Sequence, residues 1–333
     1  MSAGRSVSIK DVARRAGVAI STASLALNGG ARVAPETLRR IQDAATELNY
    51  VGNRMARRLK RGRSGVLGVT IFPGFNECHF ELAFLIQEEA RKHGYATRFF
   101  FEDLTLQNDL VQFFGEINGQ IDGLISYSGP ALEQYRQLAA MGIPCVFQDR
   151  LNAEVDFVAI DFRPGARLAT EYLLGRGFRK IATFYTGDEM RGVLPQERLQ
   201  GYIDAMTAAG LEYRDLIVEF DGNPFVHEDL YELSSRILKT GPEAVFIRSD
   251  FAALTLLRVI CDHGLRPGKD IAVVGFDNIK MGRYSNPSLT TIDYDQQWRA
   301  RKMVEILLAR IDGAVLPAQH CVSKCRLVKR ESA

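Results

Sequence analysis

The feature that most constrains the fold of this chain is an alternation of apolar, strand-like runs with helical runs that begins at Val66. The runs that we assign to strands are 66–72, 96–101, 121–127, 145–148, 181–185, 244–247 and 271–276. Between them lie segments with helical patterning, such as 81–92, 165–174, 198–209 and 252–261. Strands that alternate with helices predict α/β architecture, with doubly wound parallel sheets covered on both faces.

This alternating region, residues 65–333, is longer than one doubly wound sheet usually needs. We therefore expect a two-lobed body, with a ligand cleft at the carboxyl ends of the strands. The chain has no run of 18 apolar residues and no apolar segment near its start, so we expect neither a membrane contact nor secretion. Five scattered cysteines favour reduced thiols in the cytoplasm, without a metal site or cofactor.

The first 65 residues differ from the body in charge. They contain 13 lysine and arginine residues against 4 aspartate and glutamate residues, whereas the rest of the chain has 29 basic and 36 acidic residues. A basic head on an acidic body indicates that the head binds a polyanion. The alternative, a basic solvated tail, is disfavoured if the head folds.

The head does show a folding pattern of three helices. Ser8 begins the first with an S-x-x-D cap, and Gly17 closes it with a tight turn. The second is expected at about 20–27, and the third begins with Pro35 at its first position. Two short helices joined by a glycine turn and supported by a third form a helix-turn-helix unit, which we place at residues 1–50.

Residues 51–64 form a candidate linker. The segment NRMARRLKRGR, which starts at Asn53, is dense in arginine and lysine and has few apolar side chains. So short and self-repelling a segment is expected to be barely helical alone in water. We interpret it as a hinge that folds on DNA.

Several motifs in one order resemble the lactose-repressor (LacI/GalR) family along the whole chain. The head segment VSIKDVARRAGVAISTASLALNGG and the body segments GARLATEYLLGRGFRKIATF, ERLQGYIDAMTAAG, GLRPGKDIAVVGFDN, PSLTTID and RLVKRES carry the resemblance. It implies a helix-turn-helix head on a body that resembles periplasmic sugar-binding proteins. It also implies a homodimer that binds a palindromic double-stranded DNA operator.

The resemblance implies which residues contact DNA. The side chains that it places at base edges or at the nearby backbone are Ile20, Ser21, Thr22, Ser24, Leu25 and Asn28. In the hinge it implies Arg57, Arg58 and Leu59, with Leu59 as an apolar wedge in the minor groove. The alternatives are that Ile20 and Leu25 pack within the head and that Leu59 anchors the linker.

The resemblance also implies an effector site in the body. Its candidate residues are His79, Asp149, Arg198, Phe225, Ser249 and Asp277. Arg198 matches an arginine that reaches into the cleft, and Asp277 matches the acid opposite it. For the other four residues, ordinary packing or helix capping is the alternative. The departures at Cys78, His79 and Ser249 indicate that the effector is not one of the family's common sugars.

The function that these residues predict is a transcriptional repressor controlled by a small molecule, most simply a sugar or sugar derivative. The alternative is a corepressor-dependent regulator that senses a non-sugar metabolite such as a nucleobase. A periplasmic carrier would need a signal peptide and no head. An enzyme is not expected, because the sequence contains no Walker A motif, no G-x-S-x-G elbow and no HExxH motif.

Overall fold

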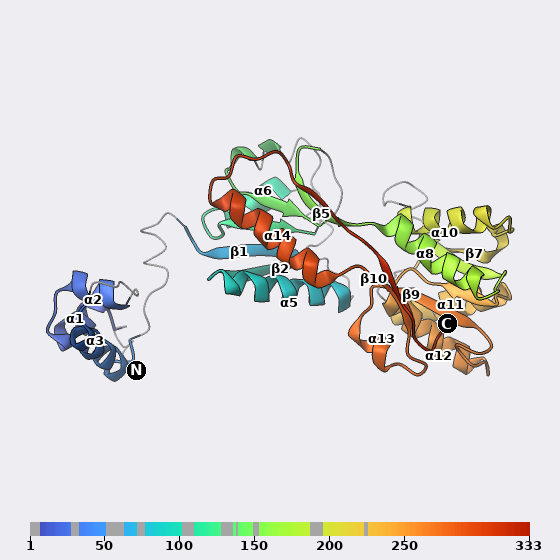
Figure 1. Cartoon of the computed structure of the whole chain (residues 1–333), viewed down its shortest axis with the longest axis horizontal. Coiled ribbons are helices and arrows are strands. Elements are labelled where there is room, and N and C mark those ends of the chain that lie inside the picture. The colour runs from blue at the N-terminus through green and yellow to red at the C-terminus, as the bar shows by residue number, and fades with distance from the viewer. Residues whose placement is uncertain are drawn as a thin grey trace. The chain divides into compact units, whose positions relative to one another are not determined.

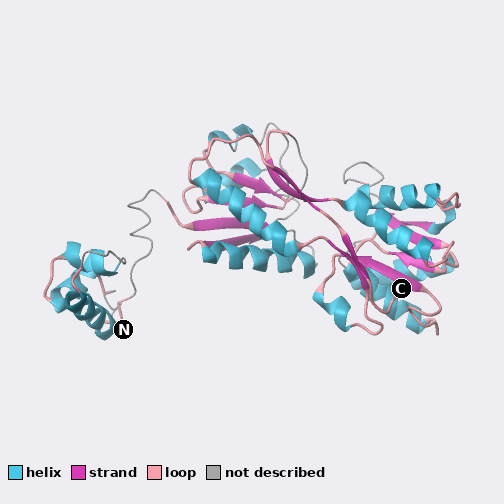
Figure 2. Cartoon of the chain, viewed as in Figure 1, coloured by secondary structure: helices cyan, strands magenta, loops and turns pink. Residues whose placement is uncertain are grey.

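A computed structural model describes residues 7–27, 33–50, 63–71, 77–101, 110–127, 136–137, 139–148, 153–186, 196–222 and 226–333. The chain divides into two compact units, Met1–Ser64 and Gly65–Ala333. Figure 2 shows that the first unit is helical in its described part, whereas the second contains both helices and strands.

The head contains the helices α1 (Ile9–Ala16), α2 (Ile20–Leu27) and α3 (Pro35–Glu47). Ser8 and Asp11 form a capping box at the start of α1, in which the Ser8 backbone N–H donates to the Asp11 carboxylate at 3.0 Å. The Ser8 hydroxyl lies 2.6 Å from the same carboxylate and donates to it. Gly17 ends α1 in the left-handed conformation, with φ of 64°. The small core lies where the three helices meet, around Val12 and Ile41, both fully buried.

The first lobe of the body is built on a parallel sheet. Its strand order is β11 (His320–Ser323), β5 (Asp156–Ile160), β4 (Cys145–Phe147), β3 (Gly123–Ser126), β1 (Val66–Ile71) and β2 (Ala96–Phe101). The helices α5 (Glu77–Lys92) and α14 (Gln296–Ile311) pack on one face, around Leu67, Ile86 and Met303. The helix α6 (Leu110–Ile117) contributes to the core on the other face.

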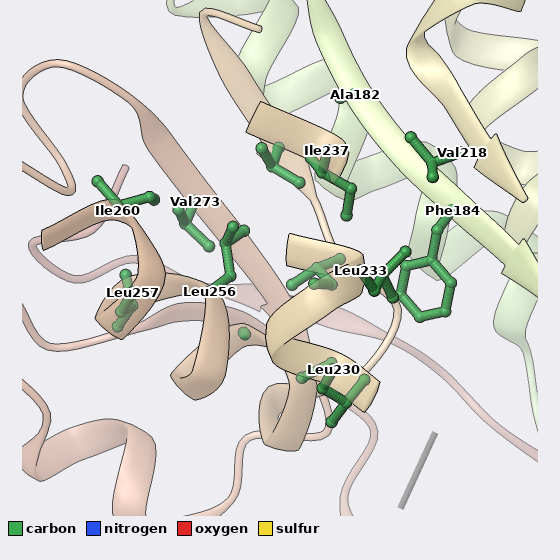
Figure 3. Close-up of a cluster of buried hydrophobic side chains, with 14 of the residues drawn as sticks. Ala182, Phe184, Val218, Leu230, Leu233, Ile237, Leu256, Leu257, Ile260 and Val273 are labelled. Atoms are coloured by element: carbon green, nitrogen blue, oxygen red, sulfur yellow. The ribbon is translucent and has the colours of Figure 1, made fainter. Parts of the chain in front are cut away.

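The second lobe repeats this plan. Its strand order is β12 (Arg326–Val328), β10 (Thr290–Asp293), β9 (Ala272–Phe276), β8 (Ala244–Phe246), β6 (Ile181–Thr186) and β7 (Ile217–Phe220), with only β12 antiparallel to its neighbour. The helices α8 (Phe162–Gly175) and α10 (Glu197–Ala208) cover one face. On the other face, α11 (His227–Lys239) and α12 (Asp250–Asp262) enclose a hydrophobic core around Leu233 and Leu256 (Figure 3).

Three described segments of the chain pass between the lobes, as Figure 1 shows. The first runs from β5 to α8 through Asp161, and the second from β10 to α14 through Tyr294 and Asp295. The third runs from β11 to β12 through Lys324 and Cys325. Several crossings allow two rigid lobes to move about a shared hinge, and they confine that motion to a few residues.

The α/β class, the helix-turn-helix head and the two-sheet body are confirmed. Each of the seven predicted strands is present, with ends shifted by at most two residues. The strands that the apolar pattern did not indicate are β5, β7, β10, β11 and β12. All but β7 flank a crossing. These short segments mix apolar and polar residues, so they carry little periodic signal. Within the described residues, no helix is long and apolar enough to cross a membrane.

The contact between α8 and α10 generates the first prediction. A Cβ atom at Gly201 would lie 2.1 Å from the carbonyl oxygen of Arg163, a distance that the backbone cannot tolerate. We therefore expect Gly201→Ala to destabilise the second lobe by about 1–3 kcal/mol, since the two helices must separate. Gly175→Ala, at the end of α8 with open space around it, is the matched control and should not destabilise. Urea unfolding measures both, and equal midpoints for the two variants would contradict the packing argument.

Candidate functional site

Arg198 lies in the first turn of α10 and stacks on aromatic rings. Its guanidinium carbon lies 3.9 Å from the ring centroid of Phe162 and 4.9 Å from that of Phe276. Its Nε atom is buried and has no hydrogen-bond partner among the described residues. A buried N–H group without an acceptor is costly, because it has lost its bond to water. Arg198 therefore presents a donor that a ligand could satisfy.

Asp277 follows β9 and is 5% exposed. It adopts a φ of 119°, a strained value for a residue with a side chain. The Tyr294 hydroxyl donates to its Oδ1 atom at 3.1 Å. Burial raises the pKa of Asp277, while the nearby charge of Arg198 and the Tyr294 hydrogen bond oppose the increase. Arg198 and Asp277 form neither an ion pair nor a hydrogen bond with each other. The Arg198 donor and the Asp277 acceptor are therefore close but not directly bonded.

A second buried carboxyl group, that of Asp250, holds the strained backbone around Asp277 in place. Its Oδ2 atom accepts the Ile279 N–H at 2.9 Å, and its Oδ1 atom accepts the Thr291 hydroxyl at 2.6 Å. In return, the backbone N–H of Asp250 donates to the Asp277 carboxylate. The two residues therefore fix each other, and Asp250, with no exposed surface, supports the site without access to a ligand. Sequence reasoning missed Asp250, although an acid that directly follows a candidate helix cap was a usable signal.

Ser249 and His79 occupy different positions in this arrangement. Ser249 caps α12, since its hydroxyl oxygen accepts the Ala252 N–H at 3.2 Å, as the capping alternative expected. His79 lies in the first turn of α5, with its ring centroid 4.7 Å from that of Tyr127. Burial, together with the charges of Arg299 and Arg198, lowers the pKa of His79 to about 4. The imidazole is thus neutral at physiological pH. The charge of Arg198 acts on His79 of the first lobe and on Asp277 of the second, so the three side chains lie within electrostatic reach of one another.

Three buried polar residues of the second crossing were not predicted. Tyr294 and Gln296 lie where β10 passes into α14, and Arg299 follows one turn later. Tyr294 contacts Asp277, Gln296 contacts the Cys78 carbonyl, and Arg299 contacts Gln296. The available signal was the polar residues that directly follow the PSLTTID motif. The predicted residues Asp149 and Phe225 lie outside the described residues, so their contribution stays a prediction.

The described DNA-contact candidates of the head, Ile20, Ser21, Thr22, Ser24 and Leu25, lie on α2. Ile20 is 47% exposed and Leu25 is 43% exposed, and neither belongs to the core of the head. The alternative that they pack within the head is therefore not what the structure shows. Ser21 is also exposed, while Thr22 and Ser24 are partly buried. Asn28, Arg57, Arg58 and Leu59 lie outside the described residues, as does the hinge over 51–62. Large apolar side chains on an exposed helix face suit contacts with thymine methyl groups.

The paired carboxylates generate a prediction about pH. Burial raises the pKa of both Asp250 and Asp277, so the folded body holds protons that the unfolded chain has released above about pH 4. This contribution to stability is present in acid and is lost as the pH rises through the raised values. In Asp250→Asn, the loss of stability between pH 5 and 8 should be smaller than in the parent by on the order of 1–2 kcal/mol.

Urea unfolding at the two pH values measures this difference. The control is Asp270→Asn, because Arg266 lowers the pKa of Asp270 to about 2 and that group does not titrate in the window. An Asp250→Asn protein with the pH dependence of the parent would contradict the assignment.

Comparisons with known proteins agree with this geometry. Residues 8–53 match the family described as bacterial regulatory proteins, lacI family, and residues 170–333 match a periplasmic binding protein-like domain. The transcriptional regulator CelR of Thermobifida fusca is 30% identical over 98% of both chains. The repressor PurR of Vibrio vulnificus is 30% identical over 91% of both chains.

Solved structures give the same answer. A lac repressor dimer bound to operator and the anti-inducer ONPF is 25% identical, with a TM-score of 0.82 over 98% of this chain and 99% of that one. A complex of the regulator CelR with cellobiose is 27% identical, with a TM-score of 0.69 over 98% of this chain and all of that one. This chain belongs to the lacI family of bacterial regulatory proteins.

Proposed function

We propose that the protein is a transcriptional repressor that binds a palindromic operator as a dimer and is controlled by a sugar or sugar derivative in the interlobe site. The observation that carries the proposal is the buried Nε donor of Arg198, which has no hydrogen-bond partner within the described part of the chain, near the Asp277 acceptor. One donor and one acceptor that do not bond each other can bind neighbouring hydroxyl groups, which act as acceptor and donor in turn. The rings of Phe162 and Phe276 hold the guanidinium in position.

A sugar is favoured as the effector class for two reasons. The site contains a neutral imidazole and a tyrosine ring, which suit the mixed polar and apolar faces of a sugar. A similar regulator, CelR, has been solved with cellobiose. The nucleobase alternative keeps its place in the test because repressors named PurR are similar to this chain over most of its length. Turnover is not proposed, since the relatives are named as regulators.

The proposal predicts a DNA-binding response that depends on Arg198. An operator selected from random duplexes should be a pseudo-palindrome with half-sites about 10 bp apart, centre to centre. A thermal-shift screen with cellobiose, ribose and hypoxanthine should identify an effector class, and the bound compound should change operator affinity by roughly 5- to 150-fold. Arg198→Ala should abolish that change and leave binding without the compound near the parent level if the compound is an inducer. If it is a corepressor, the variant should remain in its weakly binding form.

The control is Arg167→Ala, which removes an exposed arginine of the same lobe that pairs with Glu171. Recovery of the sugar chemically unchanged tests the exclusion of turnover. Selection of no duplex, or an unchanged response in Arg198→Ala, would refute the proposal.

The dimer surface that we propose combines both lobes. Phe80 and Phe84 on α5 are 37% and 56% exposed, and Phe101 at the end of the edge strand β2 is 60% exposed. The helix α13 (Lys280–Tyr284) adds the exposed Met281 and Tyr284. An ion pair of 3.4 Å between Lys280 and Glu81 places α13 beside α5. Exposed apolar side chains gathered on two adjacent helices favour a protein interface, and the similar lac repressor was solved as a dimer.

This surface predicts the effect of one charge. The parent should have twice the monomer mass by light scattering at micromolar concentration, and Phe84→Glu should be monomeric, because it places a charge in the centre of the apolar face. Val315→Asp, at an apolar residue that is 98% exposed elsewhere, should remain dimeric. A monomeric or tetrameric parent, or a dimeric Phe84→Glu protein, would exclude this interface.

A further inference from the structure

The crossing from β10 to α14 contains a chain of buried hydrogen bonds that joins the two lobes. The Tyr294 hydroxyl donates to Oδ1 of Asp277, in the second lobe, at 3.1 Å. The Gln296 side-chain amide donates to the Tyr294 hydroxyl at 3.4 Å and to the backbone carbonyl of Cys78, in the first lobe, at 3.0 Å. Asp277 is thus connected through Tyr294 and Gln296 to the first turn of α5, and Tyr294 also hydrogen-bonds the Cys78 side chain in that turn.

The donors and acceptors of this chain have a fixed direction. Burial and the neighbouring Asp277 raise the pKa of Tyr294 well above its ordinary value, so the hydroxyl keeps its proton and donates it to the carboxylate. The carbonyl of Cys78 can only accept, so it requires the N–H₂ side of the Gln296 amide. The other side of that amide, Oε1, accepts from Arg299 at 2.9 Å.

Arg299 fastens the same chain to the strands of the first lobe. It is 4% exposed, and its second guanidinium nitrogen donates to the backbone carbonyls of Gln148 and Val158, at 3.2 and 3.4 Å. These carbonyls lie directly after β4 and within β5. Gln296 therefore contacts one group that is tied to the sheet of the first lobe and another that is tied to Asp277.

A buried polar chain of this kind resists partial rearrangement. A displaced link leaves a donor or acceptor without water, which costs more than the bond contributes when it is made. A change at Asp277 is therefore passed on to Gln296 and α5 more readily than it is absorbed locally. The helix that receives it also carries Phe80 and Phe84 of the proposed dimer surface.

We propose that Tyr294 and Gln296 are positioning residues that transmit the state of the Asp277 carboxylate to α5. This inference deepens the proposed function and rests on it for its biological meaning. The two side chains act through other groups, so neither needs to contact the effector. The physical content is a coupling between Asp277 and α5 that disappears without the Tyr294 hydroxyl and weakens without the Gln296 amide, since Tyr294 also hydrogen-bonds the Cys78 side chain.

The test measures this coupling in the full-length protein without any effector, by hydrogen–deuterium exchange of the backbone amides over residues 81–86. Asp277→Asn weakens the acceptor for Tyr294 and should change exchange in this part of α5 by about fivefold, the size expected for one buried hydrogen bond. In a Tyr294→Phe background, which keeps the ring and removes the hydroxyl, Asp277→Asn should leave α5 exchange unchanged. Gln296→Met, which keeps the length but not the amide, should reduce the coupling, with the remainder carried by the hydrogen bond between Tyr294 and the Cys78 side chain.

The matched background is Tyr202→Phe. Tyr202 is also a buried tyrosine whose hydroxyl makes one hydrogen bond, to the Ile181 carbonyl at 2.7 Å, but that bond lies within the second lobe. In the Tyr202→Phe background, Asp277→Asn should still change hydrogen–deuterium exchange in α5. A purely structural role for Tyr294 predicts the same added effect of Asp277→Asn in every background, and that result would overturn the proposal.

A second measurement separates this inference from the proposed function. Operator affinity is measured with and without cellobiose, and with ribose or hypoxanthine if cellobiose has no effect on the parent. If none of these compounds changes operator affinity while the exchange coupling is present, the proposed effector class is refuted and the coupling through Tyr294 and Gln296 is supported. If the compound changes the operator affinity of the parent and of Tyr294→Phe equally, the coupling through Tyr294 and Gln296 is refuted and the effector proposal is supported.

Discussion

The body of this protein depends on how the carboxylate of Asp277 is buried. An ionised carboxylate out of water must be compensated by donors or by a proton. Here the Asp277 carboxylate accepts hydrogen bonds from the Tyr294 hydroxyl and the Asp250 backbone N–H. It also lies near the charge of Arg198 but forms no ion pair with it. These donors offset part of the cost of burying the carboxylate, and its pKa remains raised to about 6.

The same constraint explains the local structure. Asp277 and Asn278 both have positive φ values, 119° and 54°, and such backbone persists only where its surroundings hold it. Asp250 provides that hold through Ile279 and Thr291. Gly275 must lack a side chain, since a Cβ atom there would lie 2.1 Å from Asp250 Oδ1. The same few residues therefore determine both the packing at the end of β9 and the position of the Asp277 side chain.

The sequence predicted most strands and helices within the lobes, but it did not predict the strands and polar contacts at the crossings between the lobes. The reason is physical. Strands such as β1 and β9 are buried on both faces, so they are continuous apolar runs that a single sequence reveals. Strands such as β11 lie at the sheet edge and are only partly buried, and their polar residues weaken the pattern. Arg198 and Asp277 were predicted as effector-site residues through motif resemblance. Asp250, Tyr294 and Gln296 were missed because their roles come from contacts between segments distant in the chain, which spacing does not encode.

The central claim is that one interlobe site controls DNA binding, and linkage tests it most directly. If the effector changes operator affinity by some factor, the operator must change effector affinity by the same factor. Titration calorimetry of the identified effector into the free protein and into the protein–operator complex measures both dissociation constants. The account predicts a ratio between about 5 and 150 that equals the effector-induced change in operator affinity. Equal effector affinity in the two titrations would contradict it.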